Sequence, residues 1–444
     1  MMTDKNLTPQ AEHKHAVAIY WFRRDLRLED NPALLKACSE AQSMVFVYCH
    51  AAQQTTRWGF PRLGVHQAQF IDAALAELKR RLNQLGNDLL EIDASASDGL
   101  PQLAKELHAT AIYCEEIAAP EEENEVTAIR HAGIEVHAFW QSSMLSPADL
   151  PFTINQLPEV FTHCRTLIEK AAVVPPAPCP APMAIPPLPA QCDAIAHRWK
   201  RSTAPNAVPP SDPRSSFPYT DARFLGHASA AQRHLQQYLQ RKLAHTYKET
   251  RNQLTGIDYS TKFSPWLACG ALSARQIYQA LKEFESEHGA NPSSYWIWFE
   301  LLWRDYFRLL HLQYGQRLYT ARGLSQLPPP SHDAAQFKRW CEGQTGEALV
   351  DAGMIELATT GYLSNRLRQI VASYLIYDLG CDWRAGAAWF EAQLVDYDVY
   401  SNQGNWLYIA GRGTDPRNGR RFNVQKQVHD HDRDGTYRRL WLGD

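Results

Sequence analysis

The sequence predicts two differently built domains: an α/β domain with a doubly wound, parallel five-stranded sheet, followed by an all-α domain. In the first 140 residues or so, apolar runs of strand length alternate with helix-like segments. After about residue 229 the apolar residues recur with helical period, and few strand-like alternations remain. A proline-rich stretch separates the two patterns. We therefore expect an α/β domain over 1–150, a linker over 151–228 and a helical domain over 229–444.

The strands of the predicted sheet are short and apolar. Helix-like segments at Asn31–Ala41 and Gly64–Leu85 lie between them, which indicates right-handed crossovers and a ligand site at the carboxyl ends of the strands. Neither a G-x-G-x-x-G after the first strand nor a G-x-x-x-x-G-K-[ST] occurs, so the common nucleotide-binding motifs are missing. The predicted strands are Val17–Phe22, Met44–Tyr48, Leu89–Ile92, Ala111–Cys114 and Ile134–Phe139.

The stretch from Ala171 to Pro213 holds 12 of the 27 prolines. Proline at that density favours an extended chain, so we expect a linker that runs over the surface. A ligand for a partner domain that binds proline-rich segments is the alternative. Beyond the linker, helical periods are clearest at Ala230–Leu243, Ala274–Glu285, Trp296–Tyr314 and Met354–Leu379.

Composition excludes several classes of protein. An apolar fraction of 45% and a charged fraction of 21% are typical of a globular protein, and no apolar stretch is long enough to span a membrane. The first fifteen residues lack the apolar core of a secretory signal, and the nine cysteines form no C-x-x-C pair. We expect a cytoplasmic protein. The net charge of -3 neither indicates nor excludes a nucleic-acid partner, while 13 tryptophans suit a core or stacking on planar ligands.

Two clusters in the helical half combine polar residues with helix starts. Ser260, Thr261 and Ser264 precede the helix expected at Pro265, where they could cap it or, with Lys262, bind a phosphate. In WIWFELLWRDYF, Glu300 and Arg304 lie one helical turn apart, as a surface ion pair or as a functional pair among aromatic residues.

Three further clusters lie nearer the C-terminus. Asn365, Arg368 and Gln369 interrupt a helical run, and Asp396 and Asp398 alternate in a loop-like stretch. These carboxylates could pair with Arg368 or accept from ribose hydroxyls. No third ligand lies at metal spacing, so we expect no metal site. The stretch GRGTDPRNGRRFNVQKQ (411–427) is a solvated basic loop or a phosphate-contacting surface.

In this order and spacing the motifs resemble the photolyase/cryptochrome family. The opening YWFRRDLRLEDNPAL is similar to its first strand and loop, and KFSPWLACGALS, ELLWRDYFR, NRLRQIVASY, CDWRAG and DYDVYSNQGNW are similar to its flavin domain. DPRSSFPY, YKETRN and GNWLY are similar to the DASH-type branch. The resemblance covers almost the whole chain outside the linker.

The resemblance implies FAD in a U-shaped conformation within the helical domain. Arg368 and Asp396 match an ion pair beside the flavin, and Asn402 matches the residue that faces flavin N5. The implied phosphate-side contacts are Tyr247, Ser260, Thr261, Lys262, Phe263 and Ser264; the implied contacts to the ring, ribose and adenine are Arg304, Asn365, Arg368, Asp396, Asp398 and Asn402.

The implied activity is light-driven repair of cyclobutane pyrimidine dimers, by electron transfer from excited reduced FAD to a dimer turned out of the strand. Glu300 would hydrogen-bond the dimer, Trp303 would stack on it, and Gln369 and Tyr408 would line its pocket. Many repair relatives carry Met and Trp at the last two positions, so a weaker grip and a preference for single-stranded DNA follow. We expect a monomer whose phosphate contacts are Lys248, Arg251, Arg412, Arg417 and Arg420.

Photoreduction in the family uses a chain of tryptophans. Trp406 and Trp383 match its inner and middle members. Pro330 occupies the position that the count gives for the outer tryptophan, so another aromatic residue, such as Tyr319 or Trp340, must release the electron.

The resemblance also implies an antenna chromophore, the folate methenyltetrahydrofolate, on the N-terminal domain, with Glu116 or Glu121 as its acidic contact. A signalling cryptochrome, which acts as a blue-light receptor, is the alternative to a repair enzyme. A conventional photolyase for duplex DNA fits the Gln369 and Tyr408 pocket less well, and an iron–sulfur relative is disfavoured because the cysteines do not cluster near the C-terminus.

Overall fold

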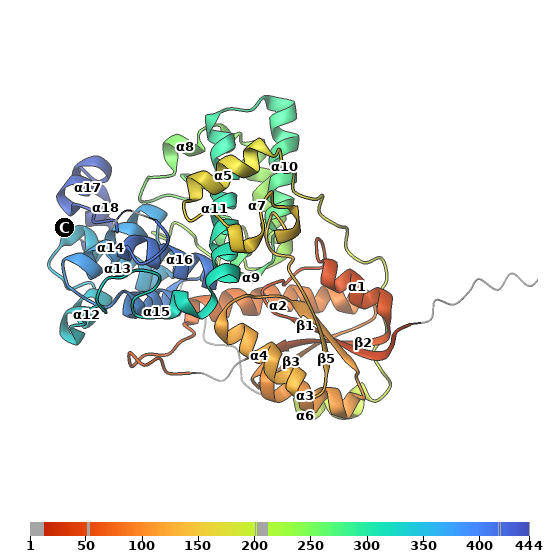
Figure 1. The fold of residues 1–444 in the computed structure, drawn as a ribbon. Helices are drawn as coiled ribbons and strands as arrows, with labels where there is room; N and C mark the ends of the chain where they lie inside the picture. Colours follow the sequence, from red (N-terminus) through yellow and green to blue (C-terminus); the bar gives the residue numbers. More distant parts are fainter. Residues whose placement is uncertain are drawn as a thin grey trace, which may run out of the picture.

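The predicted combination of an α/β domain and a helical domain is confirmed. The computed structural model describes residues 13–50, 54–199, 201, 212–415, 417 and 419–443. Figure 1 shows the sheet and its helices, in red to orange, on one side of the molecule and the helices of the second half, in cyan to blue, on the other. Among the described residues, no helix is both long and apolar enough to cross a membrane.

The sheet has five parallel strands in the order β3-β2-β1-β4-β5. Four of the five predicted apolar runs lie within one strand each, and the fifth, Ile134–Phe139, begins one residue before its strand. The order changes direction at β1, between β2 and β4, and in doubly wound sheets ligands bind at the carboxyl ends of strands at such a switch. The strands are β1 (His15–Phe22), β2 (Ala41–Cys49), β3 (Leu89–Ile92), β4 (Ala111–Glu115) and β5 (Glu135–Phe139).

Helices cover both faces of the sheet because its side chains are apolar on both. Tyr20, Phe22 and Phe46 belong to an apolar core that includes α2 and continues into the helical half, whereas Ile19 and Val47 pack in a separate cluster with α3 and α4. Burying each such side chain contributes about 1.5–3 kcal/mol. The shared core fixes one face of the sheet against the helical half. The covering helices are α1 (Pro32–Glu40), α2 (Val65–Gln84), α3 (Ala96–Leu107) and α4 (Pro120–His131).

The expected extended linker is interrupted by helix. Residues Cys192–Trp199 form α6, so an extended chain throughout 171–213 is wrong. Residues Phe161–Lys170, earlier in the linker, form α5. The physical reason is local, because no proline lies between 190 and 204. The proline-rich part does run along the α/β domain, where the Pro187 carbonyl accepts from the Met44 N–H (3.0 Å). Residues 202–211 lie outside the described residues, and the domain limits stay a prediction.

The helical half follows the predicted periods, with one difference. The segment expected at Met354–Leu379 is two helices, because Gly361 ends the first in a left-handed conformation (φ 68°) and the Ser364 hydroxyl caps the second by accepting from the Leu367 N–H (3.3 Å). The break places Asn365 and Arg368 in the first turn of a new helix.

The long helices of this half are α7 (Ala228–Gln240), α10 (Ala274–His288), α11 (Pro292–Tyr314), α13 (Ala348–Thr360), α14 (Asn365–Tyr377), α15 (Trp383–Gln393) and α16 (Val399–Ala410). Shorter helices complete it: α8 (Tyr247–Thr250), α9 (Ser264–Cys269), α12 (Ala334–Cys341), α17 (Val424–His431) and α18 (Thr436–Leu442).

Candidate functional site

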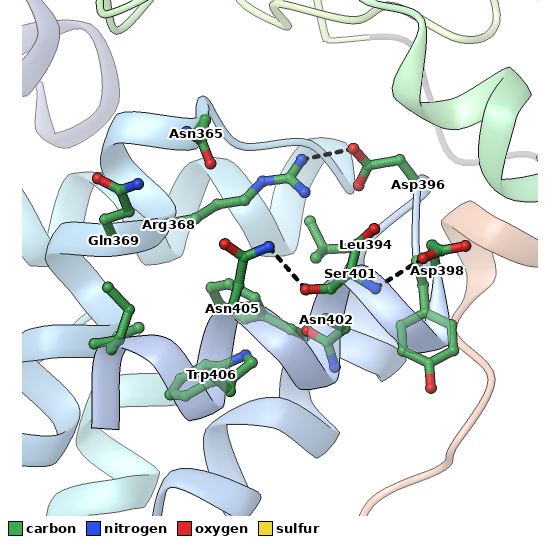
Figure 2. Close-up of a pocket in the computed structure, with 14 residues that line it drawn as sticks. Asn365, Arg368, Gln369, Leu394, Asp396, Asp398, Ser401, Asn402, Asn405 and Trp406 are labelled. Atoms are coloured by element: carbon green, nitrogen blue, oxygen red, sulfur yellow. Dashed lines mark hydrogen bonds and ion pairs between the residues drawn. The ribbon is translucent and has the colours of Figure 1, made fainter. Parts of the chain in front are cut away.

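The helical half encloses a cavity of about 420 Å³. Its walls come from the loop before α9, from α11, from the start of α14 and from α16. It continues into a smaller recess between α14, α15 and α16, shown in Figure 2. Asn365, Arg368, Gln369 and Asp396 border both spaces, so the two form one site.

The structure brings most of the predicted site residues to this cavity. Asp398, Asn402 and Trp406 line the recess. The predicted residues that line the larger part are Tyr247, Ser260, Thr261, Lys262, Phe263, Ser264, Glu300, Trp303, Arg304, Asn365, Arg368, Gln369, Asp396 and Tyr408.

An ion pair lies where the two spaces meet. Arg368 Nη2 donates to Asp396 Oδ2 (2.8 Å), and the Ser264 hydroxyl donates to the same oxygen (2.6 Å). Burial lowers the pKa of Arg368, but the charge and hydrogen bond of Asp396, together with Tyr362 and Tyr259, raise the pKa overall. Asp396 Oδ1 is buried and has no hydrogen-bond partner among the described residues. The pair therefore presents one free acceptor to a ligand.

The loop before α9 supplies a buried cation. Lys262 is 1% exposed, its backbone is left-handed (φ 57°), and its ammonium group lies 3.4 Å from the centre of the Tyr259 ring. Its Nζ has no hydrogen-bond partner among the described residues, and burial holds its pKa well below the ordinary value. An ammonium group in this state is costly unless an anion completes its surroundings. The free donor of Lys262 and the free acceptor of Asp396 thus fit an anionic ligand that also carries N–H or O–H groups.

The hydroxyl of Ser264 faces the site and does not cap the helix. The residue before α9 is Phe263, and no side chain caps this helix. Because the Ser264 hydroxyl donates to Asp396, the capping alternative is wrong for this residue.

The recess is polar at one end and aromatic at the other. Asp398 caps α16 by accepting from the Ser401 N–H (2.8 Å). Burial raises its pKa, but the charges of Arg308 and Arg304 together with the hydrogen bonds from Ser401 lower the pKa overall. The Asn402 side chain donates to the Ala387 carbonyl (3.0 Å), which fixes the orientation of its amide.

The open side of the cavity carries the residues expected to bind the lesion. Glu300 forms an ion pair with Arg251 and accepts from the Trp296 indole N–H (3.1 Å). Burial raises the pKa of Glu300, and the Arg251 charge offsets part of this. The Glu300–Arg304 surface pair is not formed, since Arg304 donates to the Ser142 carbonyl (2.7 Å).

Aromatic rings stand beside this carboxylate. Trp303 stacks on Phe161 with ring centres 3.8 Å apart, and Tyr408 lies 5.9 Å from Trp303 in an edge-to-face arrangement. Gln369 accepts from Arg366 (3.3 Å).

Two aromatic rings contact Trp406, and the place of Trp383 in an electron path stays a prediction. Its ring centre lies 6.4 Å from that of Trp340 and 5.1 Å from that of Phe390. Trp383 is buried, and its indole N–H donates to the Ala321 carbonyl (3.2 Å). Of the two substitutes for the outer tryptophan, Trp340 contacts Trp406, whereas the Tyr319 hydroxyl bonds to His311 (3.0 Å).

A second cavity, of about 660 Å³, lies at the carboxyl ends of β1 and β2. Glu121 lines it and Glu116 does not; the backbone N–H of Glu116 continues the pairing with β5 by donating to the Phe139 carbonyl (2.8 Å). Arg62 pairs with Glu121 and also with Glu391 of α15 (2.6 Å). This cavity therefore borders both halves of the molecule.

Four of the five predicted phosphate contacts lie at the surface or next to the cavity, and the fifth is buried. Lys248 and Arg417 are exposed, Arg251 lines the cavity, and Arg420 donates to the hydroxyl of Tyr408, which also lines it. Arg412 is 8% exposed and donates to the Pro328 carbonyl (2.8 Å), so the structure does not place it where a strand could reach it. Its side chain instead ties the end of α16 to the loop before α12.

Sequence reasoning missed several cavity residues. Tyr259, Tyr362, Ser401 and Asn405 line the cavity but were not among the candidates. Asn405 could have been found, since it lies three residues after Asn402 and so near the same face of α16. Tyr362 carried no such signal.

Comparison with known proteins identifies the class of protein that this fold and site define. Residues 18–183 match the family model described as DNA photolyase, and residues 296–444 match the FAD binding domain of DNA photolyase. A DASH cryptochrome of Gloeobacter violaceus is 41% identical over 96% of this chain and 85% of its own length.

Similarity to solved structures supports the same family. The crystal structure of a Synechocystis cryptochrome superposes with a TM-score of 0.89 at 40% identity, covering 97% of this chain and 89% of that one. An archaeal photolyase from Sulfolobus tokodaii, described with two FAD molecules, has a TM-score of 0.72 at 25% identity and covers 96% and 90%. The chain belongs to the photolyase/cryptochrome family, among the DASH cryptochromes.

Proposed function

We propose that this protein is a light-dependent photolyase that splits cyclobutane pyrimidine dimers, preferentially in single-stranded DNA. The observation that carries the proposal is that Glu300, Trp303 and Tyr408 open into the same cavity as the Arg368–Asp396 pair. A lesion at the mouth would thus lie beside a flavin held farther in.

FAD is the cofactor that the matched domain binds, and the residues present fit it. Lys262 offers a cation without a hydrogen-bonded partner to its phosphates, Asp396 offers a free acceptor, and Asn402 would face the ring edge from the recess. When bound and reduced, FAD would supply the light-driven electron that opens the dimer, and return of that electron would restore the reduced flavin. The protein would shield the flavin ring from water and place the lesion in contact with it.

Glu300 would bind the dimer and stabilise the negative charge that it gains. To do so it must exchange Arg251 for the lesion, and its raised pKa means that it takes up a proton at a higher pH than an ordinary carboxyl. Trp303 presents one face to the lesion because Phe161 covers the other.

The proposed preference for single strands follows from the energy of extrusion. Turning a dimer out of a duplex costs a few kcal/mol, and a single strand avoids most of this. Tyr408 is smaller than tryptophan and Gln369 is polar, so the pocket offsets that cost poorly.

Replacing Glu300 by glutamine tests the lesion contact. We expect Glu300→Gln to lower the quantum yield of repair on a single-stranded oligonucleotide while flavin content stays at the wild-type level, because the amide retains size but not charge. Dimer loss under blue light is measured by chromatography. Glu249→Gln, an exposed carboxylate on α8, is the control. Equal yields for all three proteins would contradict the assigned role.

Replacing Trp340 by phenylalanine tests the electron path. Since Pro330 replaces the outer tryptophan and Trp340 contacts Trp406, Trp340→Phe is expected to slow photoreduction in the presence of a thiol, whereas Tyr319→Phe leaves it unchanged. The loss of the oxidised-flavin absorption band under blue light reports the rate. A slow Tyr319 variant and a normal Trp340 variant would reverse the assignment.

We also propose that the second cavity holds the antenna, a folate of the methenyltetrahydrofolate type, with Glu121 as its acidic contact. Its size and its place at the carboxyl ends of the strands support this. A second chromophore is described for the Sulfolobus relative, where it is FAD.

A further inference from the structure

The first turns of α11 carry aromatic rings that continue past the mouth of the cavity. Trp296 stacks on Phe299 with ring centres 4.5 Å apart at 27°, and Phe299 meets Phe161 at 5.2 Å. Phe161 in turn stacks on Trp303, which faces Tyr408. We call these five rings the aromatic row. Phe161 is buried and joins the row rigidly, while the other four rings are half-buried and reach the surface.

Cations lie at both ends of the aromatic row. Lys248 Nζ and the Arg251 guanidinium lie 5.1 and 5.2 Å from the centre of the Trp296 ring. At the far end the Arg420 guanidinium lies 4.7 Å from the centre of the Tyr408 ring. Arg165 lies 5.6 Å from the centre of the Phe299 ring.

Carboxylates pair with the arginines beside the aromatic row and offset their charge. Positive charge alone therefore does not mark this surface as a binding site for DNA. Glu300 pairs with Arg251, Glu169 lies 3.9 Å from Arg165, and Asp415 lies 3.2 Å from Arg420. What distinguishes it is the combination of rings in a line with flexible cations beside them, which is the usual composition of a single-strand binding surface.

We propose that Trp296, at the end of the aromatic row away from Trp303 and Tyr408, binds an undamaged base beside the lesion by stacking, so that the row selects single-stranded DNA. This rests on the proposed function and deepens it. Every base has a flat face, so stacking tolerates any sequence. Bases in a duplex are already stacked on each other and cannot lie on a protein ring without being extruded. The row therefore adds affinity for single strands only.

Binding at the row also changes the pairing of Glu300. One face of Trp296 is covered by Phe299, and the side-chain ends of Lys248 and Arg251 lie over the ring. A base stacked on Trp296 takes their place, and both cations move to the strand's phosphates. Because a phosphate replaces the carboxylate as the partner of Arg251, Glu300 is released toward the lesion.

Affinity for undamaged DNA, measured in the dark, tests this. Fluorescence anisotropy with a labelled single-stranded oligothymidine and the flavin-loaded protein gives the dissociation constant. Trp296→Leu is expected to weaken binding by about 5- to 160-fold, which corresponds to stacking worth about 1–3 kcal/mol per base. Trp296→Phe, which keeps a ring, restores most of the affinity.

Two matched variants separate stacking from other effects. Trp298 lies on the same helix, and its ring meets Tyr295 (5.5 Å) rather than the row, so Trp298→Leu should bind like the wild type. Lys248→Gln should reduce the slope of log affinity against log salt by about one.

If Trp296→Leu and Trp298→Leu bind oligothymidine equally well, the aromatic row is not a stacking surface. Light-driven repair of a dimer-containing dinucleotide tests the proposed function separately, because that substrate has no flanking bases. Failure to repair it, together with lost binding in Trp296→Leu, would overturn the repair function and leave the stacking surface in place.

Discussion

Asp396→Asn is expected to abolish flavin retention and to lower the free energy of unfolding by about 3–5 kcal/mol. The substitution leaves the half-buried Arg368 without the negative charge of its 2.8 Å partner and gives the Ser264 hydroxyl a neutral, weaker acceptor. A neutral amide cannot compensate the guanidinium, so the loop before α9 and the start of α14 lose their shared anchor.

Flavin absorbance per protein and urea unfolding measure both effects. The matched control is Asp378→Asn, which breaks an exposed pair with Arg421 (2.7 Å; side-chain exposures 30% and 65%). An exposed pair contributes about 0–1 kcal/mol, so this variant should retain flavin. Wild-type flavin content and stability in Asp396→Asn would show that the pair is not the anchor.

Trp406→Phe is expected to eliminate nearly all photoreduction while leaving repair by chemically reduced protein intact. Trp406 is 2% exposed, lines the recess and contacts both Phe390 and Trp340, so it gives the recess an oxidisable indole ring in contact with Trp340. Phenylalanine fills most of the space but is far harder to oxidise.

Flash photolysis and steady blue light measure the photoreduction, and dithionite supplies the reduced protein for the repair assay. Trp389→Phe is the control, since Trp389 lies on α15 against Phe60 (5.0 Å) and outside the recess. Photoreduction that persists in Trp406→Phe would place the electron donor elsewhere.

Much of the architecture could be predicted because short segments of the sequence carry the apolar runs of strands or the apolar period of helices. The strands at Val17–Phe22 and Met44–Tyr48 are short apolar runs of the length that buried strands have, and the helix at Ala274–Glu285 has a clear apolar face. The break at Gly361 was missed because the apolar period continues across it, and only a glycine and a capping serine mark the change.

The site could be predicted where its residues lie within long sequence motifs. It could not be predicted where two interacting residues lie far apart in the sequence. Arg368 and Asp396 were expected to meet, and they do. The pairing of Arg251 with Glu300, and the burial of Arg412 against Pro328, depend on how separate helices pack. A basic residue in a glycine-rich loop gives no local sign of which way it points.

We propose that a flavin in the helical half repairs a lesion held at Glu300, Trp303 and Tyr408. The most direct measurement is blue-light repair by the purified, reduced protein on two oligonucleotides of equal sequence, one single-stranded and one duplex, each with one dimer. Efficient repair of the single strand and weak repair of the duplex is the predicted result. If the protein, with flavin bound and reduced, repairs neither oligonucleotide under blue light, the repair function is wrong and a signalling receptor is favoured.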